Sequence, residues 1–135
     1  MPLNRRKERE IVFQMLFSAQ FSPEADSESL FETLSSDWEE EGVTESEYIR
    51  STVFGVRAYA EAAREKIESC AKDWKVSRFS KTTLTVLQLA IYEMDKREDV
   101  PVRIAINEAV ELAKRFDEEG GRKFVNGILG TLAGK

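Results

Sequence analysis

The 135-residue sequence contains no histidine and a single cysteine, Cys70. Without histidine the chain lacks the usual general base, the Ser/His/Asp triad and histidine metal sites. One cysteine forms no internal disulfide, makes a poor nucleophile without a histidine, and does not supply the common zinc sites. Sparing use of cysteine also agrees with a reducing cytosol. We therefore expect a cytoplasmic protein that is not an enzyme and has no metal or cofactor.

Long apolar runs and strand patterns are missing as well. No run reaches transmembrane length, no signal-peptide core is present, and no stretch alternates apolar and polar residues. The composition, 41% hydrophobic and 33% charged, is typical of a soluble globular protein. A chain of this length normally forms one domain with a real core. We expect a single all-α domain that makes no membrane contact.

Helical periodicity is present along nearly the whole chain. It predicts helices over about residues 4–20, 27–40, 49–70, 80–97, 101–116 and 124–132, with a break at Gly120-Gly121. We expect the first to bury Val12, Met15, Leu16 and Ala19, and the second Leu30, Phe31, Leu34 and Trp38. The resulting architecture is two small helical bundles packed as one domain.

The clearest pattern follows a capping box formed by Thr44 and Glu47. After it, an apolar stripe runs for six turns in steps of four and three residues, from Ile49 to Cys70. Such a stripe suits either a coiled-coil dimer seam or packing inside a bundle. Its small members and the internal Gly55 favour packing within the chain.

Charge is distributed unevenly. Residues 1–10 carry +2, residues 11–50 carry −9 and residues 51–135 carry +2, which gives a net charge of −5. The N-terminal cations are Arg5, Arg6, Lys7 and Arg9, at a helix start where the dipole disfavours positive charge. An anionic partner, most simply nucleic acid, explains them, whereas the alternative is a solvated tail. The pI near 5 argues for local rather than indiscriminate binding.

Polar residues also interrupt two apolar helices: Asn107 and Glu108 in one, Asn126 and Gly127 in the other. A mid-helix glycine usually permits close approach of another backbone, and a buried asparagine usually ties down backbone groups. We expect structural roles for these residues. Just before them, Gly120-Gly121-Arg122-Lys123 lacks the spacing of a nucleotide-binding loop but suits a single phosphate.

Seven motifs follow one another along the chain: Arg5-Arg6-x-x-Arg9-Glu10, Gln14-x-Leu16-Phe17, Trp74-x-Val76-x-Arg78-Phe79, Leu87-x-Leu89-Ala90-Ile91-Tyr92-Glu93-Met94, Val100-Pro101, Ile106-Asn107-Glu108-Ala109-Val110-Glu111-Leu112-Ala113-Lys114 and Lys123-Phe124-Val125-Asn126-Gly127-Ile128-Leu129. In this order, and in a chain of this size, they resemble the NusB family of bacterial transcription antitermination factors.

The resemblance implies an all-α fold of two packed three-helix bundles with an extra helix. It implies one RNA-binding domain over residues 1–135, with an N-terminal half of about 1–71 and a C-terminal half of about 72–135. Such proteins bind the single-stranded boxA element of nascent ribosomal RNA together with NusE, a small-subunit ribosomal protein. They thereby help the RNA polymerase elongation complex resist termination. The residues that correspond to the family's RNA-facing regions are Arg5, Arg6, Lys7, Arg9, Lys123 and Phe124.

The sequence departs from the family at several positions. Phe17 replaces a usual Tyr, and Glu8 replaces a small residue and dilutes the basic patch. Thr83 stands where the family commonly has an acidic residue, and Leu84 and Gln88 stand where it commonly has arginines. Val102 stands where an aromatic residue is common. On the resemblance, Phe17, Thr83 and Gln88 are the candidates for contact with the protein partner, with altered charge pairing.

Two other functions fit the sequence. One is a helical protein–protein adaptor or homodimer, in which the arginines meet an acidic surface such as residues 24–47 of a second copy. The other is the N-terminal module of a ribosomal RNA cytosine methyltransferase, which also contains a NusB-like domain. We disfavour the second because the sequence to Lys135 has no dinucleotide-like glycine-rich unit.

Overall fold

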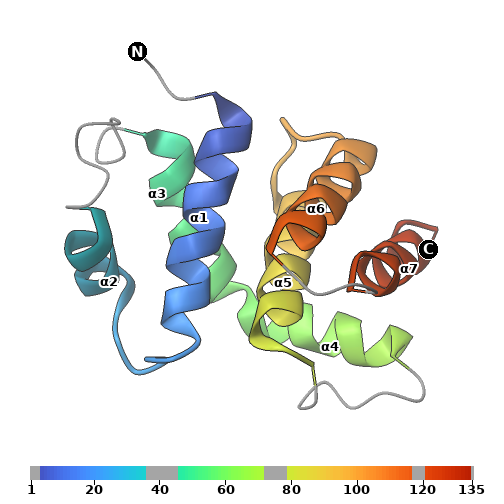
Figure 1. Cartoon of the computed structure of the whole chain (residues 1–135), viewed down its shortest axis with the longest axis horizontal. Coiled ribbons are helices and arrows are strands. Elements are labelled where there is room, and N and C mark those ends of the chain that lie inside the picture. The colour runs from blue at the N-terminus through green and yellow to red at the C-terminus, as the bar shows by residue number, and fades with distance from the viewer. Residues whose placement is uncertain (1–3, 36–45, 72–78, 117–120, 135) are drawn as a thin grey trace. The chain divides into compact units, whose positions relative to one another are not determined.

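The computed structural model describes residues 4–35, 46–71, 79–116 and 121–134, although not the side chains of residues 33–35. Every regular element in these ranges is an α-helix, so the all-α prediction is confirmed (Figure 1). The chain divides into two compact units, residues 1–58 and 59–135. The helices of the first are α1 (Arg5–Ala19), α2 (Ser27–Ser35) and α3 (Glu47–Ala58), and those of the second are α4 (Ala60–Cys70), α5 (Lys81–Lys96), α6 (Val102–Phe116) and α7 (Gly121–Ala133).

In the first unit, α1, α2 and α3 contact one another pairwise. The predicted apolar face of the first helix is confirmed, since Val12, Met15, Leu16 and Ala19 are all buried. On α3 the buried residues of the predicted stripe are Ile49, Val53 and Val56. The stripe therefore packs within the chain, as its small residues indicated.

The α2 helix begins with a cap from Asp26, whose carboxylate accepts a 2.7 Å hydrogen bond from the backbone N–H of Ser29. This hydrogen bond holds the pKa of Asp26 below its ordinary value of 3.8. The predicted Leu30 and Phe31 are buried, whereas the Leu34 side chain and Trp38 lie outside the described residues.

The predicted six-turn helix is two helices in the structure. α3 ends at Ala58 and α4 begins at Ala60, because Tyr59 adopts φ −94° and ψ 1° and interrupts the helical hydrogen bonding. The cap of α3 also differs from the prediction. Ser46 accepts a 3.2 Å hydrogen bond from the Ile49 N–H, so Glu47 is the first helical residue rather than the third. The predicted cap Thr44 lies outside the described residues.

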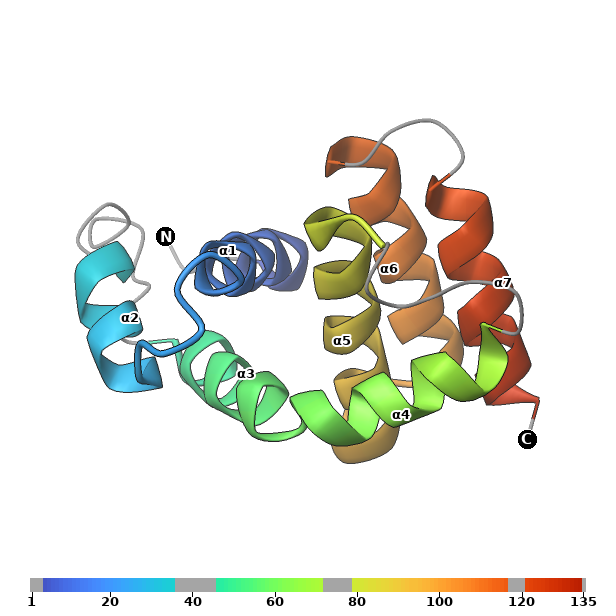
Figure 2. The same ribbon diagram turned by 90° about the horizontal axis from the view of Figure 1, so that it is seen from below.

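The second unit is built around α5, whose buried residues include Val86, Leu87, Leu89, Ala90 and Ile91. In Figure 2, α5, α6 and α7 lie side by side and α4 runs across them. Contacts from Tyr59 explain why α4 belongs with this unit. Its ring meets that of Tyr92 edge-on, and its hydroxyl donates a 2.6 Å hydrogen bond to Asp95 of α5. The sequence-based halves placed this segment with the N-terminal part instead.

Two expectations for α7 are wrong. A Cβ built on Gly127 meets nothing within 4 Å, so this glycine does not serve close approach of another backbone. Asn126 is exposed, so it does not meet the condition of burial under which an asparagine ties down backbone groups. Gly121 is the first residue of α7 instead of part of a break, while Gly120 is outside the described residues.

Pro101 is not inside the first turn of α6 but directly before it, where its carbonyl accepts hydrogen bonds from Ile104 and Ala105. None of the helices in the described ranges is long and apolar enough to cross a membrane. Among these same residues, no three Cys, Asp or Glu side chains are grouped so as to hold a metal ion.

Candidate nucleic-acid interface

The predicted basic cluster occupies the first turns of α1. Asn4 caps this helix, because its side-chain oxygen accepts a 2.8 Å hydrogen bond from the Lys7 N–H. The cap stabilises a helix start by about 1 kcal/mol and offsets the unfavourable meeting of cations with the positive end of the helix dipole. The start of α1 therefore carries a cluster of cationic side chains that would attract an anion.

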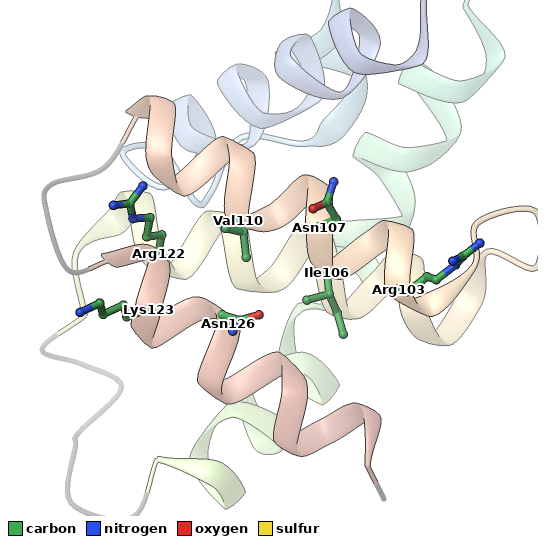
Figure 3. A pocket seen from close by; sticks show the side chains of 7 residues that line it. All are labelled: Arg103, Ile106, Asn107, Val110, Arg122, Lys123 and Asn126. Atoms are coloured by element: carbon green, nitrogen blue, oxygen red, sulfur yellow. The ribbon is translucent and has the colours of Figure 1, made fainter.

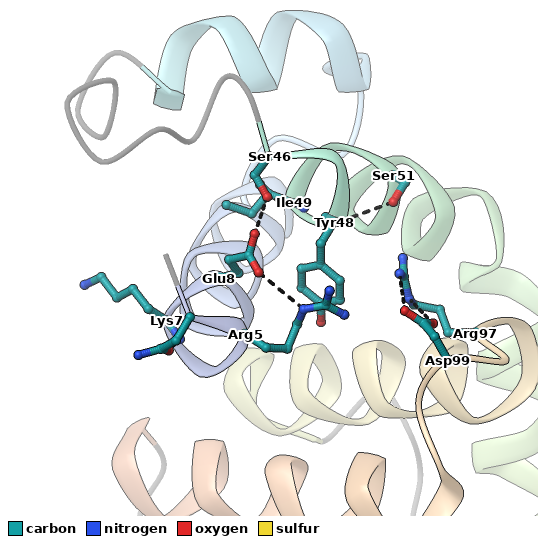
Figure 4. Close-up of polar contacts among 10 residues, drawn as sticks. Arg5, Lys7, Glu8, Ser46, Tyr48, Ile49, Ser51, Arg97 and Asp99 are labelled. Atoms are coloured by element: carbon teal, nitrogen blue, oxygen red, sulfur yellow. Dashed lines mark hydrogen bonds and ion pairs between the residues drawn. The ribbon is translucent and has the colours of Figure 1, made fainter. Parts of the chain in front are cut away.

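Arg5 is held by two neighbours. Its guanidinium lies 3.2 Å from the Glu8 carboxylate and 4.1 Å from the centroid of the Tyr48 ring (Figure 4). The second Glu8 oxygen accepts a hydrogen bond from Ser46, the cap of α3. Glu8 therefore does more than dilute the positive charge, because it also joins the starts of α1 and α3.

The other three cations differ in accessibility. Arg6 and Lys7 are exposed, and Lys7 extends away from the helix in Figure 4. Arg9 is only 4% exposed, and its guanidinium carbon lies 5.7 Å from the centroid of the Tyr48 ring. Arg5, Arg6 and Lys7 are therefore the exposed members of the cluster, and Arg9 is the buried one.

Sequence reasoning missed Tyr48 and Ser46. Tyr48 is buried and faces two guanidinium groups, an arrangement in which each contact contributes about 0.5–1 kcal/mol or more. Both residues adjoin the predicted stripe at Ile49, and Ser46 is itself a good helix cap. However, nothing in the sequence indicated that this helix start meets the basic cluster.

A second candidate surface lies between α6 and α7 of the C-terminal unit. It is an open cavity of about 490 Å³. Helix α6 contributes Arg103, Ile106, Asn107 and Val110, and α7 contributes Arg122, Lys123 and Asn126 (Figure 3). The figure shows Arg103 at one end and Arg122 with Lys123 at the other.

The predicted pair Lys123 and Phe124 is divided between this surface and the interior. Lys123 is exposed and lines the cavity. Phe124 is half-buried, and its ring meets that of Phe79 edge-on with a centroid separation of 4.8 Å. The pair thus presents one cation and, at most, part of one ring.

The three predicted partner-contact residues lie in different surroundings. Phe17 is half-buried in α1 and forms a row with Phe13, at 6.0 Å, and Phe21, at 5.2 Å between ring centroids. Phe21 is 61% exposed. Thr83 is buried and hydrogen-bonded to the α5 cap Ser80, whereas Gln88 is half-buried.

Comparisons with known proteins identify relatives along nearly the whole chain. The family model of the NusB family matches residues 6–134. The chain is 41% identical to the transcription antitermination protein NusB of Limosilactobacillus fermentum, over 99% of this chain and 96% of the relative. The structure of T. maritima NusB has a TM-score of 0.90 at 32% identity, covering 100% of this chain and 94% of that one.

A third similar structure contains the antitermination factors NusB and NusE in complex with dsRNA. Its TM-score is 0.80 at 21% identity, over 95% of this chain and 94% of that chain, so the likeness concerns the fold.

Proposed function

Because the chain belongs to the NusB family of transcription antitermination factors, which are not enzymes, we propose that it binds boxA-type single-stranded RNA of nascent ribosomal RNA together with NusE. Bound in this way, it helps the transcribing RNA polymerase resist termination in the cytoplasm. The observation that carries the RNA part is the exposed pair Arg6 and Lys7 at the capped start of α1.

The basic cluster acts on RNA in two ways under this proposal. Arg6 and Lys7 neutralise backbone phosphates and release counterions, which makes the affinity depend on salt. Arg5, whose guanidinium lies 4.1 Å from the centroid of the Tyr48 ring and pairs with Glu8, offers a guanidinium group that is positioned before RNA arrives. Arg9 is buried and therefore makes a smaller direct contact with RNA. On the C-terminal unit, Lys123 contributes a further phosphate contact and Phe124 the edge of its ring.

The NusE contact is proposed for the row of aromatic rings on α1 and the turn that follows it. Phe17 and the exposed Phe21 form an apolar surface of the type that protein interfaces use. On the C-terminal unit, Gln88 of α5 is a separate candidate for this partner and has a half-buried amide. Thr83 serves mainly to begin α5, because its backbone N–H donates to Ser80 at 3.0 Å.

A binding titration tests the proposal directly. A boxA-type single-stranded RNA and a scrambled RNA of equal length are each titrated with the protein, with and without purified NusE. We expect tighter binding of the boxA-type RNA and a larger difference when NusE is present. Equal affinity for the two RNAs in the presence of NusE would favour the adaptor function, and sedimentation would then test for a homodimer.

A pair of charge variants tests the site. Arg6→Ala with Lys7→Ala removes two exposed cations, so the slope of log K against log salt should fall by ~1.4. The matched control, Arg64→Ala with Lys114→Ala, removes the same net charge from exposed positions on α4 and α6. An equal loss of affinity in both double variants would contradict a local contact at α1.

A further inference from the structure

The cavity between α6 and α7 is lined by polar and cationic side chains that are not needed to hold the two helices together. Three of its seven lining residues are cations, and none is a carboxylate. Asn107 and Asn126, which the sequence suggested as structural residues, are exposed. Because exposed amides hydrogen-bond equally well to water, neither asparagine is needed to satisfy a buried backbone group.

The lining is ordered along the cavity. Arg103 lies at one end, Arg122 and Lys123 lie at the other, and Asn126 with the half-buried Ile106 and Val110 lies between them (Figure 3). The apolar side chains suit the face of a flat group, and an amide beside them suits its polar edge. The flanking cations suit a negative charge on either side of that group. An unpaired nucleotide within a single strand has this form, since its base lies between two backbone phosphates.

We propose that this cavity binds one unpaired nucleobase of single-stranded RNA and contributes to the choice of base. The base lies on Ile106 and Val110, the amide of Asn126 hydrogen-bonds to its edge, and Arg103 and Arg122 bind the flanking phosphates. This inference rests on the proposed function and adds to it a site of base discrimination on the C-terminal unit.

Charge alone would also suit an acidic protein segment, but the Asn126 amide favours RNA. The carboxylates of an acidic segment only accept hydrogen bonds, so they would pair with the three cations. They would not use the amide's ability to accept a hydrogen bond as well as donate one. The edge of a nucleobase presents donors and acceptors together, and an asparagine amide is able to pair with both at once. The cavity volume of about 490 Å³ also lies in the range of sites for small, flat ligands.

The decisive variant removes the amide and leaves the cations. Asn126→Ala should reduce the preference for boxA-type over scrambled RNA about tenfold, as expected when a good base contact is lost. Asn107→Ala is the matched control, because the Asn107 amide points away from α7 in Figure 3. Both residues are exposed, so the thermal unfolding midpoint should stay essentially unchanged. Asn126→Ser provides a second variant that retains a polar side chain. Arg103→Ala with Arg122→Ala should instead weaken the binding of both RNAs to the same extent. It should also lower the slope of log K against log salt by ~1.4.

Photocrosslinking locates the base independently of affinity. RNAs carrying one 4-thiouridine at successive positions are irradiated in complex with the protein, and the linked peptides are identified by mass spectrometry. We expect one position to link to peptides of residues 103–110 or 122–126, and this link should weaken in the Asn126→Ala variant.

Each outcome decides a different point. If the wild type binds RNA but the Asn126 variants keep full discrimination and no link forms, the base site is overturned while the proposed function stands. If the wild type binds neither RNA, both are overturned. If the arginine variant weakens NusE binding and leaves RNA binding unchanged, the cavity belongs to a protein partner instead.

Discussion

Glu8 controls how much positive charge the start of α1 presents. One of its carboxylate oxygens pairs with Arg5 at 3.2 Å, and the other accepts a hydrogen bond from Ser46. Glu8→Gln removes the negative charge but keeps an oxygen that Ser46 can use. We expect this variant to bind single-stranded RNA about two- to fivefold more tightly at low salt, with a smaller gain at high salt because exposed charges are screened.

Fluorescence anisotropy with labelled RNA at two salt concentrations measures this gain. The matched control is Glu61→Gln, which makes the same change of net charge at an exposed position on α4. Equal gains in the two variants would show that net charge, rather than the Arg5 contact, sets the affinity.

Gly127 makes α7 less stable than its packing allows. Nothing lies within 4 Å of a Cβ built there, and the same holds for Gly130. An alanine loses less backbone entropy than glycine in a helix, so Gly127→Ala and Gly130→Ala should each raise the free energy of unfolding by about 0.5–1 kcal/mol. Urea unfolding followed by circular dichroism measures the change. A loss of stability in either variant would mean that the glycine accommodates a contact in the folded state.

At the scale of the helix, Ser80 fixes where α5 begins. Its hydroxyl oxygen accepts from the Thr83 N–H, and its O–H donates to the Thr83 hydroxyl, both at 3.0 Å. Ser80→Ala should lower the free energy of unfolding by about 1 kcal/mol. Ser80→Asp keeps an acceptor and places a negative charge at the helix N-terminus, so it should retain most of the stability. Equal urea midpoints for Ser80→Ala and the wild type would show that this cap is dispensable.

The contact between α4 and α5 is sensitive to high pH. The Asp95 carboxylate accepts hydrogen bonds from the Tyr59 hydroxyl and the Lys66 ammonium. These bonds raise the pKa of Tyr59 above 10.0 and that of Lys66 above 10.5. Because both groups bind their protons more tightly in the folded state, their contribution to stability is complete below pH about 10 and is lost as the pH rises through the raised pKa values.

An absorbance titration of tyrosinate tests this dependence. Tyr59 should ionise later than an unperturbed tyrosine, and Asp95→Asn should bring its pKa down toward 10. The signal is assigned with Tyr59→Phe, which leaves Tyr48 and Tyr92 as the tyrosines. A Tyr59 titration that does not respond to Asp95→Asn would contradict the hydrogen bond.

Much of the helical architecture follows from the sequence, because apolar spacing and capping residues act locally. The predicted start at about residue 80 and the predicted end of the first helix at about residue 20 both agree with the structure. The break at Tyr59 was missed because the apolar stripe continues on either side of it, at Val56 and Ala63. A periodic pattern records which side of each helix is buried and does not reveal that the two segments bury their faces in different units.

The candidate site was less predictable than the fold. The basic cluster is visible in the sequence, but the burial of Arg9 and its contact with Tyr48 depend on residues far apart in the chain. Asn126 shows the opposite problem. An asparagine inside an apolar run suggested a structural role, yet its position on α7 faces solvent, since Val125, Ile128 and Leu129 form the buried side of that helix.

At the scale of the whole molecule, the net charge of −5 repels the phosphates of RNA. RNA binding therefore depends on where the cations are concentrated. Two such places are proposed, one on each unit. They are the start of α1, with Arg6 and Lys7, and the α6–α7 cavity, with Arg103 and Arg122. If both serve one RNA molecule, the phosphates that they neutralise belong to a single binding equilibrium.

The salt dependence of affinity then predicts how the two surfaces combine. Removing either pair of cations should lower the salt slope by ~1.4, and removing all four should lower it by ~2.8, because each neutralised phosphate of a single strand contributes ~0.7. The stoichiometry, measured by calorimetry with an RNA of about 12 nucleotides, should remain one to one in every variant. If the two surfaces bound separate RNA molecules, the wild type would bind two strands and each double variant one. That result would contradict the binding of one RNA molecule by both units and would make the N-terminal cluster and the cavity independent sites.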